Sequence, residues 1–206
     1  MKACELMDEE IKQNLIKLEM TKQKLFAAFA EAKLGDGIGY YQAVALDGYI
    51  SKSSPKYKEA NAQDEQLNRQ QLYEIVGSAN YYNDFVHVWM DAKGMHFFLP
   101  IFLLCAESDT VDKVLRDLVA QEEPKYKELM SLLSVEQKKC IIKSIEDDVD
   151  YDSWVAFYLS FKGHECHKCK QTHQPENYSL AEAKAKVESK DNFKLLQLLK
   201  ENLGSQ

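Results

Sequence analysis

The sequence predicts a mostly α protein, an irregular helical bundle with little or no β structure. Two observations lead to this prediction. Apolar residues recur along most of the chain at the three-, four- and seven-residue spacings of amphipathic helices. Helix-capping patterns, of which SVEQ at 134–137 is the clearest, stand before several of these stretches. A chain of 206 residues with 45% hydrophobic content can also bury a sizeable core.

The first third of the chain is expected to contain three helices. A long opening helix ends at GDGIG, residues 35–39, and a second helix is expected over YYQAVALDGYI, residues 40–50. The polar stretch at 51–66 is predicted to be a connection, and a further helix follows near 67–76. The opening helix is indicated by an apolar stripe of Ile11, Leu15, Leu18, Leu25, Phe26 and Phe29.

The middle of the chain permits two predictions. FVHVW at 85–89 has the β-branched and aromatic character of a strand, whereas the apolar residues after it recur with a helical period. We favour a helix that Asp91 caps and Pro100 kinks, because proline removes a backbone donor and crowds the carbonyl four residues back. Because of its β-branched and aromatic residues, the segment 85–89 is the one most expected to be extended.

Helices are also expected on both sides of the glutamate-proline break at 122–124. Asp109 or Thr110 can cap the helix before it, which would run through Leu118. After the break, a short helix is expected, and SVEQ then opens another that runs through Ile145.

The acidic sequence EDDVDYD, residues 146–152, interrupts the apolar pattern. We expect a solvated connection there, because the ordered ligand positions and central glycine of a calcium loop are missing. The predicted organisation is one domain over 1–150 and a helical C-terminal extension over 151–206. Within the extension, an apolar helix is expected over 152–161, and SLAE at 179–182 opens the last helix.

Composition and charge limit the classes of partner. Lys and Arg total 26 against 33 Asp and Glu, and the net charge of −7 disfavours binding to nucleic acid. The longest apolar run, at 97–106, is too short to span a bilayer, and the N-terminal sequence lacks the apolar run of a signal peptide. We therefore expect a cytoplasmic protein with no nucleic acid or membrane partner. Five cysteines, an odd number, argue against a disulfide framework.

The sequence HECHKCKQTH contains the strongest candidate metal ligands. Cys166 and Cys169 have the spacing that lets two thiolates bind one tetrahedral ion, and His173 with His164 or His167 would complete a Cys₂His₂ set. Zinc is the cofactor that such a set would bind. A redox pair and an exposed polar loop stay open as alternatives, because all ligands come from one short loop and no thioredoxin-like βαβ context surrounds them.

A second cluster consists of Asp84, His87, Asp91 and His96. If one helix contained them, their spacing would place histidine and carboxylate groups near one face, where they could bind a metal or transfer protons. The alternative is that Asp91 caps a helix and that both histidines are structural, since their neighbours are apolar. No residue is assigned a catalytic or cofactor-binding role.

GDGIG invites comparison with loops that bind phosphate through backbone amides at a helix start. It lacks the lysine and Ser or Thr of a P-loop and the full G-x-G-x-x-G pattern. We therefore predict a tight turn between helices that uses the conformational freedom of glycine.

Aromatic residues suggest a binding surface. Tyr40, Tyr41, Tyr81, Tyr82 and Trp89 could form such a surface, since aromatic side chains anchor protein interfaces more often than other surface residues do. Packing into the core is the alternative for each of them.

One resemblance is carried by three segments: GDGIGYYQAVALDGY at 35–49, DAKGMHFFLP at 91–100 and YKELMSLLSVEQKKCIIKSI at 126–145. Together they resemble an uncharacterised family of small bacterial proteins of unknown function. Its members share a GDGIG-type turn, a D-x-x-G-x-x-F-x-L-P motif and a late helix rich in leucine and glutamine. The resemblance covers about residues 25–150, and it implies no activity.

We expect a noncatalytic protein-binding or regulatory protein, because the chain is acidic and aromatic and has no recognisable nucleophile or cofactor loop. The sequence specifies neither the partner nor the oligomeric state. The alternative is a metal-dependent enzyme or zinc-binding module that uses the His/Asp or the Cys/His cluster. A pocket that joins His87, Asp91 and His96 to Asp36 would favour the enzyme, and an exposed aromatic surface would favour the binding protein.

Overall fold

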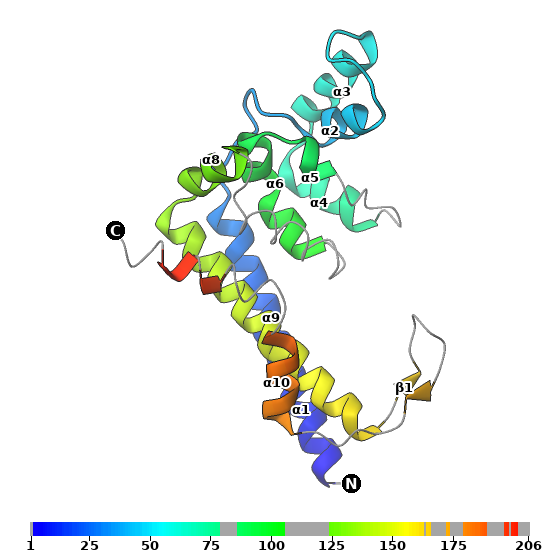
Figure 1. Cartoon of the computed structure of the whole chain (residues 1–206), viewed down its shortest axis with the longest axis vertical. Helices are drawn as coiled ribbons and strands as arrows, with labels where there is room; N and C mark the ends of the chain where they lie inside the picture. The colour runs from blue at the N-terminus through cyan, green and yellow to red at the C-terminus, as the bar shows by residue number, and fades with distance from the viewer. Residues whose placement is uncertain are drawn as a thin grey trace. The chain divides into compact units, whose positions relative to one another are not determined.

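The computed structural model describes residues 2–78, 86–105, 124–162, 164–165, 172–173, 179–188, 196–197 and 199–201 (Figure 1). The prediction of a mostly α fold is confirmed. The chain divides into two compact units. Unit 1 comprises Met1–Lys24 and Lys139–Gln206, and unit 2 comprises Leu25–Lys138.

Unit 2 contains the end of α1 (Lys2–Ala28), the start of α9 (Val135–Lys162) and the helices between them. Its core is aromatic and aliphatic, and the ring of Phe98 packs against the rings of Tyr40, Phe97 and Phe102. The remaining helices are α2 (Tyr40–Asp47), α3 (Pro55–Gln66), α4 (Arg69–Ser78), α5 (Val86–Trp89), α6 (Ala92–Cys105) and α8 (Pro124–Leu132).

Unit 1 contains most of α1 and α9, the helix α10 (Leu180–Glu188) and one small hairpin. The hairpin pairs β1 (His164–Glu165) with β2 (Thr172–His173) in antiparallel register, so that His164 lies opposite His173. The predicted cap of the last helix is confirmed, because the Ser179 backbone N–H donates to the Glu182 carboxylate at 2.6 Å.

Two other predicted caps are also confirmed. Ser134 and Gln137 form the capping box of α9: the Gln137 N–H donates to Ser134 Oγ at 3.2 Å, and the Ser134 N–H donates to Gln137 Oε1 at 2.9 Å. Asp91 caps α6 by accepting from the Gly94 N–H at 2.8 Å. Pro100 lies inside α6, as expected.

The prediction of a polar connection at 51–66 is wrong, because Pro55–Gln66 forms α3. Ser54 caps this helix by accepting from the Tyr57 N–H at 3.2 Å, and Pro55 occupies the first helical turn, where its missing N–H has no cost. Tyr57, Ala60 and Asp64 are buried. The buried face has few apolar residues, so hydrophobic periodicity did not indicate it.

The expected break at 146–152 is also wrong, because α9 continues through this segment and through residues 152–161. Asp147 is only 1% exposed and contacts Lys17, Lys143 and Thr21. These contacts neutralise the Asp147 carboxylate, which the acidic sequence pattern predicts to be exposed to solvent.

The extended conformation considered for 85–89 is not observed, since Val86–Trp89 forms the short helix α5. Lys125 donates through Nζ to the carbonyl oxygens of His87 at 3.3 Å and Val88 at 2.6 Å. A tertiary contact thus satisfies carbonyls of a helix with only four residues. The helix predicted from Asp109 or Thr110 lies outside the described residues.

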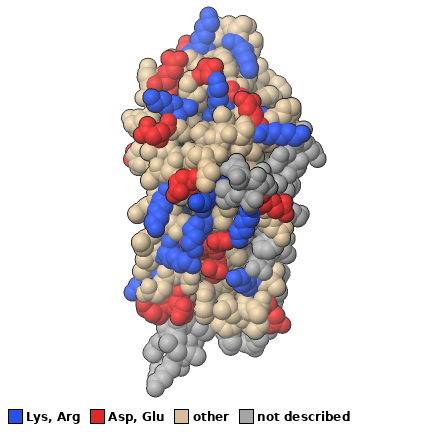
Figure 2. Space-filling view, turned by 90° about the vertical axis from the view of Figure 1, so that its left-hand side faces the viewer, with Lys and Arg blue, Asp and Glu red and all other residues tan. Residues whose placement is uncertain are grey.

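Within the described part of the chain, no helix is both long and apolar enough to cross a membrane. On the face that Figure 2 shows, basic and acidic side chains lie next to one another.

Candidate functional site

The GDGIG loop and the start of α6 form one joint contact in unit 2. Asp91 Oδ1 accepts from the Ile38 N–H at 3.1 Å as well as from the Gly94 N–H. A Cβ on Gly94 would lie 2.1 Å from the Ile38 carbonyl oxygen, and one on Gly37 would lie 2.8 Å from the Gly94 nitrogen. Both glycines are therefore required by close approach of two backbones. Gly35, at a φ of 58°, supplies the left-handed residue of the turn.

The N-terminus of α2 is occupied by a carboxylate of the protein itself. Asp64 accepts through Oδ1 from the Tyr41 N–H and through Oδ2 from the Gln42 N–H, each at 2.9 Å. A Cβ on Gly39 would lie 2.2 Å from Asp64 Cγ. Burial raises the pKa of Asp64, and the bonds from the α2 amides oppose this rise. The prediction that GDGIG is a turn is confirmed, and these amides already have an acceptor.

Four exposed residues lie on α2, on α5 and directly after α2, and we call them the α2–α5 surface: Val44, Tyr49, Val88 and Trp89. The two helices pack against each other. The Trp89 indole N–H donates to Asp47 Oδ1 at 3.0 Å, and Asp47 is the last residue of α2. The surface is therefore built by helix packing and by one hydrogen bond between the helices.

Tyr49 is the most unusual residue of this surface. It is 94% exposed, and its φ of 57° lies in the left-handed region, which residues with a Cβ rarely adopt. The backbone there closes the end of α2, since the Tyr49 N–H donates to the Leu46 carbonyl at 3.0 Å and the Ile50 N–H donates to the Ala45 carbonyl at 2.9 Å. Sequence reasoning missed Tyr49, and glycine or asparagine would have been the usual local signal for such a position.

The predicted aromatic surface is observed only in part. Trp89 is exposed by 38%, but Tyr40 is buried and Tyr41 is half-buried. Tyr41 packs edge-on against the Tyr40 ring with centroids 5.5 Å apart, and it also packs against the buried residues Ala45, Tyr57 and Ala60. Tyr81 and Tyr82 lie outside the described residues.

The described side chains of the second predicted cluster have separate structural roles. His87 is 1% exposed and its ring lies 6.4 Å from that of Phe102, whereas His96 Nε2 is 3.1 Å from Gln137 Oε1. Asp91 binds the backbone amides described above. In the described ranges, no three His, Cys, Asp or Glu side chains are arranged to hold a metal ion.

Asp36 of the GDGIG loop pairs with a lysine. Its Oδ1 lies 2.5 Å from Lys93 Nζ, and this hydrogen bond lowers the pKa of Asp36. Asp84, the other acid of the second cluster, lies outside the described residues.

The predicted zinc ligands cannot be placed as a set. Cys166, Cys169 and His167 lie outside the described residues, and only the backbone of His164 and His173 is described, as partners in the hairpin. The zinc site therefore stays a prediction.

Unit 1 contains a buried carboxylate that sequence reasoning assigned to solvent. Asp147 Oδ1 lies 2.7 Å from Lys17 Nζ and 2.8 Å from Lys143 Nζ, and Oδ2 accepts from the Thr21 hydroxyl at 2.7 Å. Burial favours the protonated acid, but the three hydrogen bonds outweigh it and lower the pKa of Asp147. Because its charge is neutralised within the unit, this arrangement supports structure rather than chemistry.

Comparison with known proteins places the chain in a family. A family model described as "Family of unknown function (DUF6714)" matches residues 18–151. The chain belongs to this family. The match includes the GDGIG turn, the α2–α5 surface and Asp147, and it excludes the Cys/His sequence. No curated protein and no solved structure matches the chain.

Proposed function

We propose that this chain is a noncatalytic protein-binding protein and that the α2–α5 surface contacts its partner. The proposal rests on Tyr49. A left-handed conformation costs a residue with a Cβ roughly 1–2 kcal/mol, and a ring that is 94% exposed regains little of this by packing. Tyr and Trp are enriched among the few residues that dominate binding energy at protein interfaces.

The neighbours of Tyr49 support the same function. The Trp89 indole N–H is already bonded to Asp47, so a partner that covers Trp89 would bury no unsatisfied donor. Val44 and Val88 add exposed apolar area. Apolar and aromatic groups with paired polar atoms are typical of the central part of an interface.

Charge suggests the chemistry of the partner. The chain has a net charge of −7, and the Asp47 carboxylate lies next to the α2–α5 surface, where it accepts from Trp89. A protein with an apolar patch bordered by Lys or Arg would complement both features, and such complementarity increases association rates and selects partners.

Photo-crosslinking would identify the partner. The probe p-benzoylphenylalanine is placed at Tyr49 in the organism's own cells, and at Tyr73 as a control. Tyr73 is also partly exposed in unit 2, but it lies in α4, where its ring contacts Phe26. We expect a discrete adduct at position 49 that is absent at position 73, and mass spectrometry identifies the protein. Equal adducts at both positions would contradict the proposal.

Affinity and stability measured together provide the second part of the test. With the identified partner, Tyr49→Gly should weaken binding by about thirtyfold, the effect of losing an interface anchor of ~2 kcal/mol. The same change should raise the free energy of unfolding by roughly 0.5–1 kcal/mol, because glycine adopts the left-handed conformation without strain. Reduced stability in urea unfolding would assign the ring a structural role, and unchanged affinity would exclude this surface.

A zinc-binding hairpin is a second proposal, and one observation favours it. His164 and His173 lie opposite each other in the β1–β2 register, which brings the two ends of the ligand-rich loop together. Cys166 and Cys169 would supply the other two ligands of a tetrahedral site.

Elemental analysis of untagged protein tests this proposal. We expect one zinc per chain after zinc-supplemented expression, lost in Cys166→Ser with Cys169→Ser and kept in the control Cys140→Ser in α9. Acidification should release the metal, since protons compete for thiolate and imidazole. A chain without zinc, or a double variant that retains it, would refute the site.

A further inference from the structure

Arg69 places a guanidinium group inside unit 2. The residue begins α4 and is only 7% exposed. Nε donates to the Phe97 carbonyl at 3.1 Å, Nη2 donates to the Ala32 carbonyl at 2.7 Å, and Nη1 donates to the Phe29 carbonyl. A guanidinium has five N–H groups, so two of them have no acceptor among the described residues.

The positive charge of Arg69 lacks a counter-ion within the described part of the chain. Its bonds go to neutral carbonyls, and burial lowers the pKa of the group. The Phe97 ring, whose centroid lies 4.6 Å from Cζ, and the Phe26 ring at 5.9 Å provide partial compensation through their π faces. A buried charge that is not fully paired gains most from an ion that can reach it.

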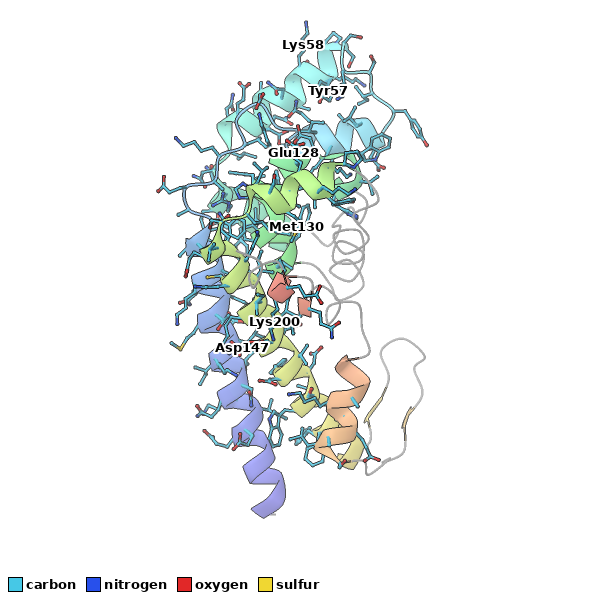
Figure 3. The ribbon with its side chains drawn as sticks, turned by 60° about the vertical axis from the view of Figure 1, so that its left-hand side comes forward. Tyr57, Lys58, Glu128, Met130, Asp147 and Lys200 are labelled. Atoms are coloured by element: carbon cyan, nitrogen blue, oxygen red, sulfur yellow. The ribbon has the colours of Figure 1, made fainter. Side chains whose placement is uncertain are left out.

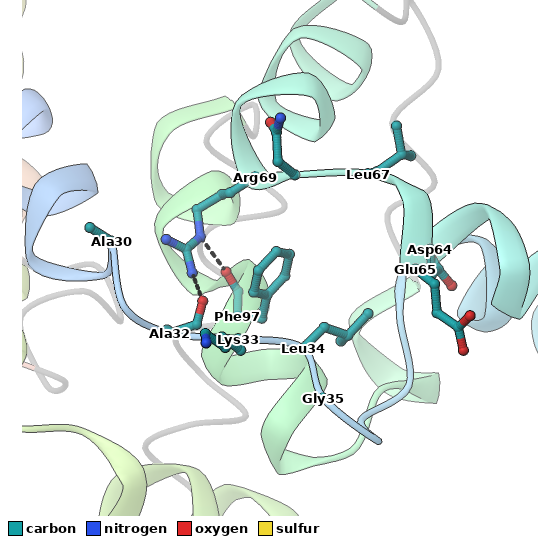
Figure 4. Close-up of a pocket in the computed structure, with 11 residues that line it drawn as sticks. Ala30, Ala32, Lys33, Leu34, Gly35, Asp64, Glu65, Leu67, Arg69 and Phe97 are labelled. Atoms are coloured by element: carbon teal, nitrogen blue, oxygen red, sulfur yellow. Dashed lines mark hydrogen bonds between the residues drawn. The ribbon is translucent and has the colours of Figure 1, made fainter.

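A cavity of about 400 Å³ lies against Arg69, and we call it the Arg69 cavity (Figure 4). Its volume falls within the range of small-molecule sites. Leu34, Leu67 and Phe97 supply apolar walls, and Lys33 lines the cavity beside Ala32, on the Arg69 side. Asp64 and Glu65 lie on the side opposite Arg69.

We propose that the Arg69 cavity binds the carboxylate group of a small, mainly apolar molecule through Arg69. Nε–H is bonded to Phe97, so one remaining N–H on each of Nη1 and Nη2 would supply charge-assisted hydrogen bonds to the carboxylate, and the apolar walls would contact the body of the molecule. This site is independent of the α2–α5 surface, because it uses none of the four residues of that surface.

The opposite wall defines the other end of the molecule. Both oxygens of Asp64 accept from α2 amides, and Glu65 Oε1 accepts from Asn61 Nδ2 at 2.6 Å. A second carboxylate on the ligand would meet these two acids and be repelled. The distal end is therefore neutral or cationic.

Titration of the intact chain with four six-carbon probes tests the proposal. Hexanoate and 6-aminohexanoate should cause saturable shifts of the Arg69 Nε–Hε resonance and of the amides of Ala32 and Gly35. Adipate should bind about fivefold more weakly because of its second charge. Hexylamine, which lacks the carboxylate, should cause no shift. If neither monocarboxylate gives saturable shifts at these groups, or if hexylamine gives the same shifts, the proposal is wrong.

Arg69 supports the fold, so its substitution would change stability as well as binding. Variants of the acidic wall test the cavity without this effect. Glu65→Gln, at an exposed position, should raise the affinity for adipate about fivefold and leave that for hexanoate unchanged. Glu59→Gln is the matched control, because Glu59 is also exposed on α3 but does not line the cavity. An unchanged affinity for adipate in Glu65→Gln would refute the assignment of the distal end.

Discussion

Asp147 in unit 1 and Arg69 in unit 2 are both buried charged residues, but their surroundings neutralise them differently. Asp147 projects from α9 (Figure 3). It is paired with two lysines and one hydroxyl. Arg69 donates to three carbonyl oxygens and stacks on aromatic rings, without a carboxylate among the described residues.

The difference separates a structural charge from a candidate binding group. A carboxylate with cations on it has little to gain from a ligand, whereas a guanidinium that contacts only carbonyls and rings still has charge and donors to offer. A cavity lies against Arg69. Burial of a charged side chain alone therefore does not indicate a binding site. A buried charge indicates one when no counter-ion of the protein neutralises it.

The largest effect is expected from removing the cations around Asp147. Lys17→Met together with Lys143→Met should lower the free energy of unfolding by roughly 3–5 kcal/mol at pH 7, because the carboxylate would stay buried with only Thr21 as donor. Adding Asp147→Leu should restore much of the loss, since no charge then remains to be compensated. Urea unfolding measures all three chains. A double variant as stable as the original chain would show that Asp147 is solvated and would remove the contrast with Arg69.

A smaller loss is expected from Arg69→Lys, about 1–3 kcal/mol, because one ammonium group cannot reach three carbonyls arranged around a planar guanidinium. Hexanoate should raise the melting temperature of the original chain and have much less effect on the variant. An equal rise in both chains would mean that the acid binds elsewhere.

The smallest effect is expected in the free energy of unfolding when the pH is lowered. The pKa of Asp147 is lowered in the folded chain by its three hydrogen bonds, against the effect of burial. Its contribution to stability is therefore present above the ordinary aspartate pKa of about 3.9 and is lost as pH falls through the lower, folded value. The stability difference between the original chain and Asp147→Asn should be constant from neutral pH to about pH 5 and shrink below about pH 4.

The corresponding difference for Arg69→Lys should not change over this acidic range, because guanidinium and ammonium both stay charged. Circular dichroism followed through urea unfolding at several pH values compares the two. A difference for Asp147→Asn that persists unchanged well below pH 3 would show that this carboxylate is not the titrating group.

Local signals predicted the elements whose cause is local. The Ser134 and Gln137 capping box and the Asp91 cap depend on residues close in sequence, and each was found where the pattern indicated it. The GDGIG turn was also predicted, although its contact with Asp91 and Gly94 is not local. The helix over Pro55–Gln66 was missed although its cap, Ser54 before Pro55, is also local. Its low apolar content outweighed that signal.

The sequence by itself determined the mostly α fold and the caps of α6, α9 and α10, because periodicity and caps act over a few residues. It also determined membership of the family, whose model matches residues 18–151. Only the tertiary structure decided which charges are buried and which aromatic residues are exposed. Lys17 reaches Asp147 from another helix, and Arg69 meets carbonyls at Phe29 and Phe97. Whether a charge is compensated depends on such distant partners, and no local pattern of the chain encodes them.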